Sequence, residues 1–231
     1  MKNHGFTLVE VLITLGIVGI VAAITMPTIV NKYQKLQTVA KLKKAYTVLA
    51  QVMQRAVADN SAAELGIGET LDKNKVKDFF ETYWYPYFNA PKIYNNSLGD
   101  TFYSCRNGNS YNSNISTNYQ YGRIFFITKD GFSYYIKIMT WSRNDKGDLA
   151  DPLIASQQNV LIDINGIKPP NMLGKDVFYF LIDYEHGVVR PFGYDKNKAQ
   201  IDSDCNKTGL GMSCAAKIIH DGWKISDDYP W

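Results

Sequence analysis

The spacing of apolar residues changes along the chain and divides it into segments with different expected structures. Between residues 6 and 30, Glu10 is the only charged residue, and this stretch would span about 37 Å as a helix. Over residues 39–56, apolar side chains recur at steps of three and four, which predicts one buried face of a helix. We therefore expect a single helix over residues 6–58, whose first half is apolar on every side and whose second half packs against a domain.

The remaining elements are predicted by shorter patterns. Residues 72–85 carry an aromatic stripe, expected in the core, and precede a proline, which predicts a second helix. Residues 94–122 are rich in Asn, Ser, Gly and Tyr and predict a long surface loop that either contacts a partner or extends into solvent. Apolar runs separated by turn residues predict strands at 123–128, 132–139, 160–164, 177–183 and 188–192. The hairpin turns favour an antiparallel sheet, so the expected fold class is α+β.

Composition and motifs limit the classes of function. Of the 231 residues, 45% are hydrophobic and 20% are charged, as in globular proteins. The net charge of +3 is too small to indicate nucleic-acid binding by itself. The sequence has no G-x-S-x-G, and Asp183, Glu185 and His186 lie on an expected turn, where charged residues are usually solvated. The sequence therefore does not predict an enzyme.

Three interpretations compete for the apolar stretch at residues 6–30. A secretory signal peptide would have a shorter apolar core, of roughly 7–15 residues, before its cleavage site. A plain membrane anchor fits the length, since the hydrocarbon core needs about 20 apolar residues, but it gives Glu10 no role. An acidic residue in a membrane segment is costly and indicates a specific partner, which the third interpretation supplies.

The third interpretation is a resemblance carried by the first ten residues. Met-Lys-Asn-His-Gly followed by Phe-Thr-Leu-Val-Glu resembles the leader of type IV pilins and type II secretion pseudopilins. In that family a dedicated peptidase cuts after the glycine and methylates the new N-terminus. The resemblance implies cleavage between Gly5 and Phe6, N-methylation of Phe6, and a Glu10 that faces the positive N-terminus of a neighbouring subunit. His4 departs from the pattern, because Lys or Arg usually precedes the glycine.

The resemblance also implies a pilin-like lollipop architecture and a cellular route. Residues 1–5 would be the leader, residues 6–58 a long helix with a transmembrane and assembly part at about 6–30, and residues 59–231 an extracytoplasmic globular domain. Pro27 is expected to kink the helix, because proline removes a backbone hydrogen bond. The precursor would cross the bacterial inner membrane once and then enter a periplasmic or surface filament.

On this interpretation the chain is a structural subunit of a type IV pilus or a type II secretion pseudopilus. Its partners would be the prepilin peptidase, other pilin subunits, the inner-membrane assembly platform and the membrane. Two alternatives stay open. One is a membrane-anchored extracytoplasmic binding module that does not polymerise, and the other is a minor pilin for DNA uptake, for which scattered lysines and tyrosines give little support.

The charges that flank the apolar stretch favour the opposite orientation. The positive-inside rule places the more basic flank in the cytoplasm. Only Lys2 and the N-terminal amine precede the stretch, whereas five lysines follow it, at Lys32, Lys35, Lys41, Lys43 and Lys44. We give precedence to the leader pattern because it accounts for Glu10, whereas the charge rule is statistical.

The three cysteines leave at least one thiol without a partner in the same chain. Cys205 and Cys214 enclose a short segment with two glycines and are the expected disulfide, in keeping with an oxidising compartment. Cys105 is either free or replaces one of them. A zinc site is not expected, because the sequence has no C-x-x-C and no histidine completes a ligand set.

A run that begins D-I-N-G at Asp163 is similar to the start of a calcium-binding loop. The EF-hand pattern requires oxygen ligands at its fifth and twelfth positions, where this chain has Ile167 and Gly174, so it is not an EF-hand. Asn-Gly is also typical of a simple turn. Asp176 could still close a calcium site with Asp163 and Asn165, and some pseudopilins bind calcium. Apart from this open expectation, no cofactor is predicted.

Overall fold

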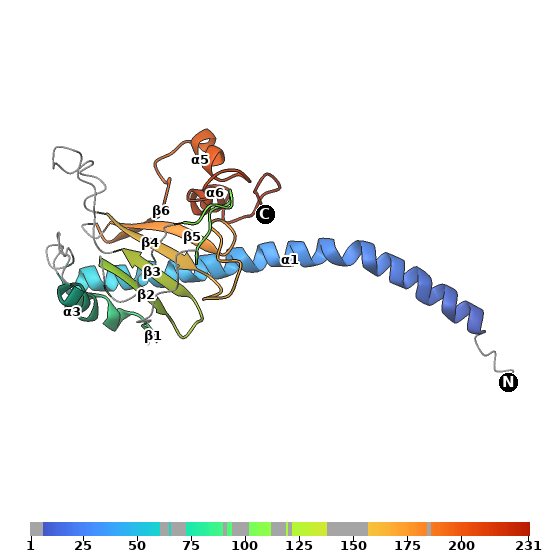
Figure 1. Ribbon diagram of the computed structural model, residues 1–231, viewed down its shortest axis with the longest axis horizontal. Coiled ribbons are helices and arrows are strands. Elements are labelled where there is room, and N and C mark those ends of the chain that lie inside the picture. The colour runs from blue at the N-terminus through green and yellow to red at the C-terminus, as the bar shows by residue number, and fades with distance from the viewer. Residues whose placement is uncertain are drawn as a thin grey trace. The chain divides into compact units, whose positions relative to one another are not determined.

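The computed structural model describes residues 7–60, 65, 73–89, 92–93, 102–111, 119, 122–137, 157–183 and 186–231. The chain divides into two compact units, Met1–Gln37 and Thr38–Trp231. The elements in chain order (Figure 1) are α1 (Leu8–Asp59), α3 (Lys73–Tyr83), the 3-10 helix η1 (Tyr85–Tyr87), β1 (Lys92–Ile93), β2 (Arg123–Ile127), β3 (Ser133–Lys137), β4 (Gln157–Asp163), β5 (Val177–Asp183), β6 (Val188–Pro191), α5 (Lys198–Asp204) and α6 (Cys214–His220).

The first unit consists of the N-terminal part of α1. The helix begins at Leu8 and continues through Pro27 without interruption. Proline has no amide hydrogen, so the carbonyl four residues earlier, at Ala23, loses its usual helical donor. The predicted long helix is confirmed, whereas the kink at Pro27 stays a prediction.

The C-terminal part of α1 is amphipathic and belongs to the second unit. Its buried side chains recur at three- and four-residue steps, and they are Leu42, Ala45, Leu49, Val52, Met53 and Ala56. The helix ends at Asp59, where the Asn60 side chain donates from Nδ2 to the Ala56 carbonyl at 2.9 Å. The spacing that predicted one buried face is therefore confirmed.

The six strands form one sheet in the order β1-β2-β3-β4-β5-β6, and each strand pairs antiparallel with its neighbours. The antiparallel sheet and the α+β class predicted from the sequence are confirmed. β5 has the predicted bounds, whereas β4 begins three residues earlier than residues 160–164 suggested. Polar residues at the start of β4 concealed this extension.

Both faces of the sheet are buried, which explains why its strands are almost continuously apolar. One face carries the paired residues Phe126, Tyr134, Ile162 and Phe178, and α1 and α3 cover it. The opposite face carries Phe125, Tyr135, Leu161 and Tyr179, and residues 102–111 contribute side chains to that second core. Successive side chains on a strand point to opposite faces, so one apolar run supplies both cores.

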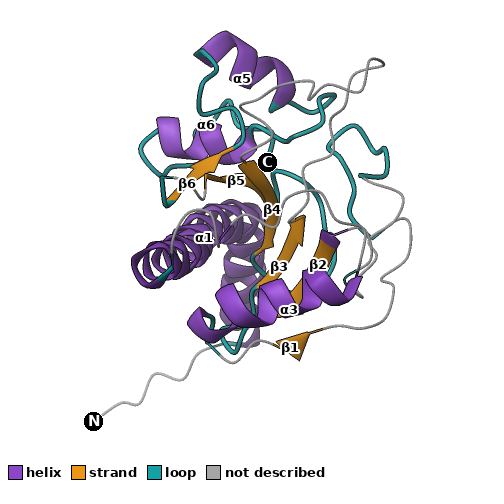
Figure 2. Cartoon of the chain, turned by 90° about the vertical axis from the view of Figure 1, so that its left-hand side faces the viewer, coloured by secondary structure: helices purple, strands orange, loops and turns teal. Residues whose placement is uncertain are grey.

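The helix face of the sheet is joined to α1 by rings and by a hydrogen bond. Figure 2 shows the C-terminal part of α1 beside the sheet. The buried Tyr134 hydroxyl donates to the Ala45 carbonyl at 3.1 Å. The ring of Tyr46 lies 5.5 Å from the ring of Phe180, between centroids. These contacts hold the C-terminal part of α1 against β3 and β5.

Two short helices near the C-terminus were not predicted from the sequence. α5 begins with a capping box, in which the Asn197 side chain accepts from the Gln200 amide and the Gln200 side chain accepts from the Asn197 amide. This spacing is a recognisable start signal. The predicted loop at 94–122 lies mostly outside the described residues. Its longest described segment, 102–111, pairs with the chain near Met172.

Candidate functional site

The start of α1 is capped by its own side chains. The Thr7 amide and hydroxyl both donate to Glu10 Oε2, each at 2.8 Å, and the Glu10 amide donates back to Thr7 Oγ1 at 3.3 Å. This reciprocal pattern is a capping box, which satisfies donors that the first helical turn leaves unpaired. Glu10 is therefore held at the helix start with a fixed side-chain direction. The capping box gives one physical reason for the Thr-x-x-Glu spacing of Thr7 and Glu10.

The helix that follows Glu10 exposes apolar side chains in every direction. α1 is the one helix among the described residues that is long and apolar enough to cross a membrane. Its exposed apolar residues include Leu8, Val9, Leu12, Ile13, Leu15, Ile17, Val18, Ile20, Val21, Ile24, Met26 and Ile29. A helix that is apolar all round requires an apolar environment. Gly5 and Phe6, the predicted cleavage residues, lie outside the described residues.

The predicted disulfide is present between Cys205, just after α5, and Cys214, the first residue of α6, with 4.9 Å between their Cα atoms. Cys105 is a free, buried thiol, and burial raises its pKa. The alternative in which Cys105 replaces one of the pair is therefore wrong. Cys105 lies in the second core, where it packs as a small apolar side chain.

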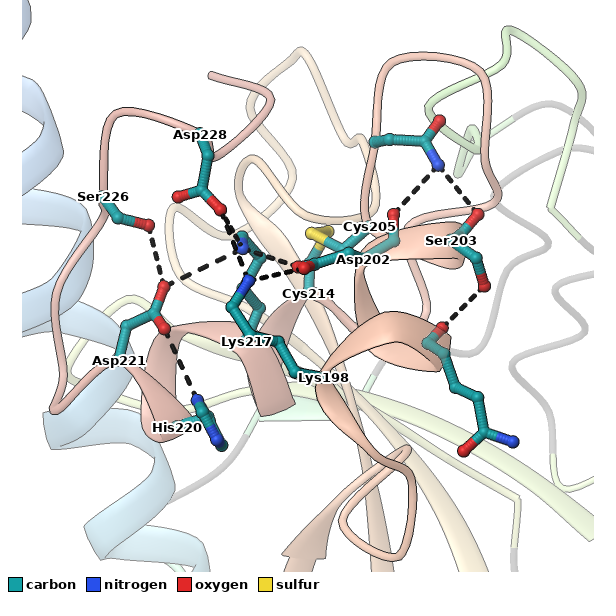
Figure 3. A network of polar contacts seen from close by, with 12 residues as sticks. Lys198, Asp202, Ser203, Cys205, Cys214, Lys217, His220, Asp221, Ser226 and Asp228 are labelled. Atoms are coloured by element: carbon teal, nitrogen blue, oxygen red, sulfur yellow. Dashed lines mark hydrogen bonds and ion pairs between the residues drawn. A yellow bond between two sulfur atoms is a disulfide. The ribbon is translucent and has the colours of Figure 1, made fainter.

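A cluster of charges, here named the C-terminal clamp, joins α5, α6 and the final residues (Figure 3). Its centre is Lys217, whose side chain is only 3% exposed. Lys217 Nζ lies 2.7 Å from Asp202 Oδ1 and 2.7 Å from Asp228 Oδ2, with Asp221 Oδ2 at 3.9 Å. Lys198 also reaches Asp202, at 2.5 Å. This cluster was not predicted from the sequence.

The clamp shifts the ionisation of its members in the directions expected for paired charges. The hydrogen bond from Lys217 lowers the pKa of Asp228, and hydrogen bonds from Lys198 and Lys217 lower the pKa of Asp202. Burial acts to lower the pKa of Lys217, but hydrogen bonds to Asp202 and Asp228 outweigh it and raise that pKa. Asp202, Asp228 and Lys217 therefore favour their charged forms in the folded chain, and their contacts tie the C-terminal residues to both helices.

The residues predicted as a possible calcium site come together at the base of the β4–β5 hairpin. Asp163 ends β4 and pairs with Val177, the first residue of β5, so Asp163 and Asp176 flank the loop. Asp163 is 0% exposed and Asp176 is 5% exposed. Asn165 donates from Nδ2 to Asp176 Oδ2 at 3.1 Å and from its amide to Asp163 Oδ1 at 3.1 Å. The predicted convergence of the three residues is therefore present.

A fourth residue, Asn171, joins this group, which we name the hairpin neck: Asp163, Asn165, Asn171 and Asp176. The amides of Asn171 and Met172 donate to the Asp176 carboxylate at 2.9 and 2.7 Å. Within the described parts of the chain, three buried oxygens of the neck have no hydrogen-bond partner, and they are Asp163 Oδ2, Asn165 Oδ1 and Asn171 Oδ1. The described part of the neck therefore holds three buried acceptors without a donor.

The electrostatics of the neck reflect its burial. Burial raises the pKa of Asp163 to about 9; the charge of Asp176 adds to the rise, while the Asn165 amide opposes it. Burial also raises the pKa of Asp176, although hydrogen bonds from Met172 and Asn171 oppose the change. The ring of Tyr103 is buried nearby, and burial followed by the Asp163 charge raises the pKa of its hydroxyl well above its ordinary value.

The described residues were also compared with the usual metal sites, which are built from histidine, cysteine and carboxylate side chains. Over the described ranges, no group of three or more His, Cys, Asp or Glu side chains could hold a metal ion. A cation at the neck would therefore depend on amide oxygens as well as on the two carboxylates. That donor set is one that Ca²⁺ accepts, because calcium binds carboxylate, amide and carbonyl oxygens.

Comparison with known proteins gives one match, at the N-terminus. Searches among curated proteins and among solved structures gave no match. A family model described as the prokaryotic N-terminal methylation motif matches residues 1–26. The matched residues include Gly5, Phe6, Thr7 and Glu10, together with most of the exposed apolar stretch. This chain therefore carries at its N-terminus the signature of the prepilin-type cleavage domain of type IV pilins and pseudopilins.

Proposed function

We propose that this chain is a pilin-like structural subunit, cleaved between Gly5 and Phe6, methylated at Phe6, and assembled through α1 into a type IV pilus or a type II secretion pseudopilus. The observation that carries the proposal is the methylation motif followed by a helix that exposes apolar side chains on all sides. Such a helix is stable only when lipid or other apolar helices surround it. Lipid would surround it in the precursor, and helices of neighbouring subunits would surround it in the filament.

Glu10 has a specific role in this proposal. A carboxylate in an apolar environment is tolerated when it is paired with a cation and hydrogen-bonded. Cleavage after Gly5 would create that cation, the amine of Phe6. Within the chain, Thr7 donates to Oε2 of Glu10, and Oε1 has no partner among the described residues. Oε1 is thus the atom that would accept the amine of a neighbouring subunit and set the register between two helices.

The cellular route follows from the same proposal. The precursor would span the inner membrane once, with residues 59–231 outside the cytoplasm. Its partners would be the prepilin peptidase, related subunits and the inner-membrane assembly platform. The Cys205–Cys214 disulfide supports this location, because disulfides persist in oxidising compartments.

The mass and N-terminal sequence of the mature protein test the proposed processing. We expect loss of Met1 to Gly5 and one added methyl group on Phe6. A Gly5→Leu variant, which removes the cleavage glycine, is expected to keep the unprocessed mass. A mature chain that begins after Ala23 would instead show that the stretch is an ordinary signal peptide.

Replacement of Glu10 by valine tests the assembly step. A filament subunit with Glu10→Val should be inserted into the membrane at normal levels and yet be absent from sheared filaments. The rival, a membrane-anchored binding module, needs no charge at this position. Normal activity of the variant without polymer formation would therefore favour that module over a filament subunit.

A further inference from the structure

One row of residues crosses five strands of the sheet on the face that carries the second core. The register pairs each member with the next, and the row, here named the cationic row, consists of Arg123, Lys137, Asn159, Leu181 and Arg190. Each member lies two positions from a residue of the second core, and residues two apart on a strand share a face. All five are partly exposed to solvent. We propose that the cationic row binds an acidic, extended segment of another protein.

The row sets two cations directly opposite each other and adds a third on β6. Arg123 on β2 pairs with Lys137 on β3, and like charges at directly opposed positions of a sheet repel each other. Burial lowers the pKa of Lys137, and the charge of Arg123 lowers it further. A carboxylate bound between these side chains would offset their repulsion.

Acidic side chains of the described residues do not neutralise the row. Neither Lys137 nor Arg190 forms an ion pair with any residue that the structure describes. Asp183 follows Leu181 by two positions on β5 and so shares this face. Its carboxylate is engaged by His186, whose Nδ1 lies 2.8 Å from Asp183 Oδ2. The charges of the row are therefore suited to a carboxylate that comes from outside the described chain.

Two buried polar groups at the row also lack hydrogen-bond partners within the described ranges. Tyr135 precedes Lys137 by two positions, and it is 3% exposed with an unpaired hydroxyl. The Nε atom of Arg190 is buried and unpaired as well, while its guanidinium lies over the Tyr194 ring, 4.8 Å from the centroid. Buried polar groups are normally hydrogen-bonded, so these two groups indicate an acceptor that a bound segment would supply.

The dimensions and composition of the row favour an acidic polypeptide as the ligand. Neighbouring strands lie about 4.8 Å apart, so the three inter-strand steps from Lys137 to Arg190 cover about 14 Å. In an extended chain, side chains at positions i and i+4 face the same way and also lie about 14 Å apart. Two carboxylates at that spacing would therefore match the two cations. Guanidinium groups pair with carboxylates through parallel hydrogen bonds, and Arg and Tyr are enriched at the centres of protein interfaces.

The test uses the full-length chain in an uncharged detergent. The probe is a fluorescein-labelled peptide of four Glu-Ser repeats, which presents carboxylates at alternate positions, and the control peptide has Gln in place of every Glu. Fluorescence anisotropy should show saturable binding of the acidic peptide, at least about tenfold tighter than binding of the control peptide. The affinity should fall at least about threefold when NaCl is raised from about 20 to about 200 mM, because salt screens exposed charges.

Variants locate the peptide on the row. Lys137→Gln and Arg190→Gln should each weaken binding of the acidic peptide at least about threefold. Lys207→Gln removes the same charge from an exposed position outside the row and should bind like the wild type. Lys137→Gln should also keep or raise the unfolding temperature, since it removes a charge that repels Arg123. Weaker binding by this variant would then not be a consequence of unfolding.

Several results would overturn the proposal. Absence of binding to the acidic peptide is one, and equal binding by the wild type and both row variants is another. Tighter binding of duplex DNA or of a heparin oligosaccharide would overturn the choice of an acidic polypeptide. A lower unfolding temperature for Lys137→Gln would count against the row as a binding site, because the lysine would then serve the fold. None of these results bears on the proposed pilin-like function, which rests on the methylation motif and α1.

Discussion

Gly174 lies so close to Cys214 that a β-carbon built on the glycine would come within 2.6 Å of the disulfide-bonded Sγ. Gly174 also has a φ of +73°, a conformation that favours glycine. Its carbonyl accepts the Tyr229 hydroxyl at 2.5 Å. The backbone of the β4–β5 loop, the disulfide and the C-terminal residues therefore meet at one glycine.

Substitution of Gly174 should be among the most damaging single changes in the second unit. Gly174→Ala is expected to cost about 3–4 kcal/mol of unfolding free energy, from backbone strain and from a clash that a disulfide sulfur cannot avoid. Gly131→Ala is the matched control, because its φ is +82° but no atom of the described residues lies within 4 Å of the added carbon. The control should lose only about 1 kcal/mol. Urea unfolding curves measure the free energy of unfolding of both variants. Equal losses in Gly174→Ala and Gly131→Ala would contradict the close contact.

The C-terminal clamp predicts a specific dependence of stability on pH. The pKa values of Asp202 and Asp228 are lowered in the folded chain, so the stability that they contribute is present above their ordinary pKa near 4. It is lost as the pH falls from about 4 through the lowered values. The raised pKa of Lys217 adds a second loss, above about pH 10.5, as that side chain deprotonates.

Lys217→Met tests the origin of this acid sensitivity. At pH 7 the variant should unfold about 4–8 °C below the wild type, since it leaves the clamp carboxylates without their central cation. Its unfolding temperature should then fall less than that of the wild type between pH 4 and pH 2. Lys224→Met, an exposed lysine in the same C-terminal region, is the control and should behave like the wild type. Circular dichroism at constant ionic strength gives these temperatures, and parallel acid curves for Lys217→Met and the wild type would show that the clamp is not responsible.

The disulfide should stabilise the second unit even though it closes a short loop. Cys205 and Cys214 are separated by 9 positions, for which the chain-entropy model gives about 2.7 kcal/mol. Reduction with dithiothreitol should therefore lower the free energy of unfolding by about 2–3 kcal/mol in both the wild type and Cys105→Ala. The Cys105→Ala variant is the control, because it lacks the only other cysteine of the sequence. A reduction effect that disappears in Cys105→Ala would show that Cys105 exchanges with the pair.

The sequence was most informative where structure depends on neighbours along the chain. The apolar run of β5 predicted its bounds, and the D-x-N spacing indicated that Asp163, Asn165 and Asp176 would meet. The methylation motif is also local, because it lies within residues 1–26. In each case the physical cause lies within a few residues or within one hairpin, so no tertiary contact had to be known.

The sequence was least informative where a residue depends on distant partners. Lys217 is nearly fully buried, and its closest partners lie 15 and 11 positions away in the chain. A lysine is exposed in most proteins, so its burial could not be predicted without those carboxylates. Asn171 was missed for the same reason, because its position is held by Ser104, which is far away in sequence. α5 was missed although its capping box was legible, because a helix of seven residues leaves no apolar period.

Glu10 caps the start of α1, and we also propose that its negative charge pairs with a neighbouring subunit. Two variants separate these roles. Glu10→Gln keeps an oxygen that accepts from Thr7 but removes the negative charge, so the helix start should persist while assembly into filaments falls at least tenfold. Thr7→Val removes a hydroxyl that bonds to Glu10 but keeps the charge, and loss of a capping hydroxyl typically costs about 1 kcal/mol. We therefore expect processed, assembled protein at near wild-type yield for Thr7→Val. Quantitative mass spectrometry of sheared filaments and of membranes measures the assembled fraction of each variant. If Glu10→Gln assembled normally and Thr7→Val did not, the carboxylate would serve the helix of its own chain, and the register between subunits would need another pair of residues.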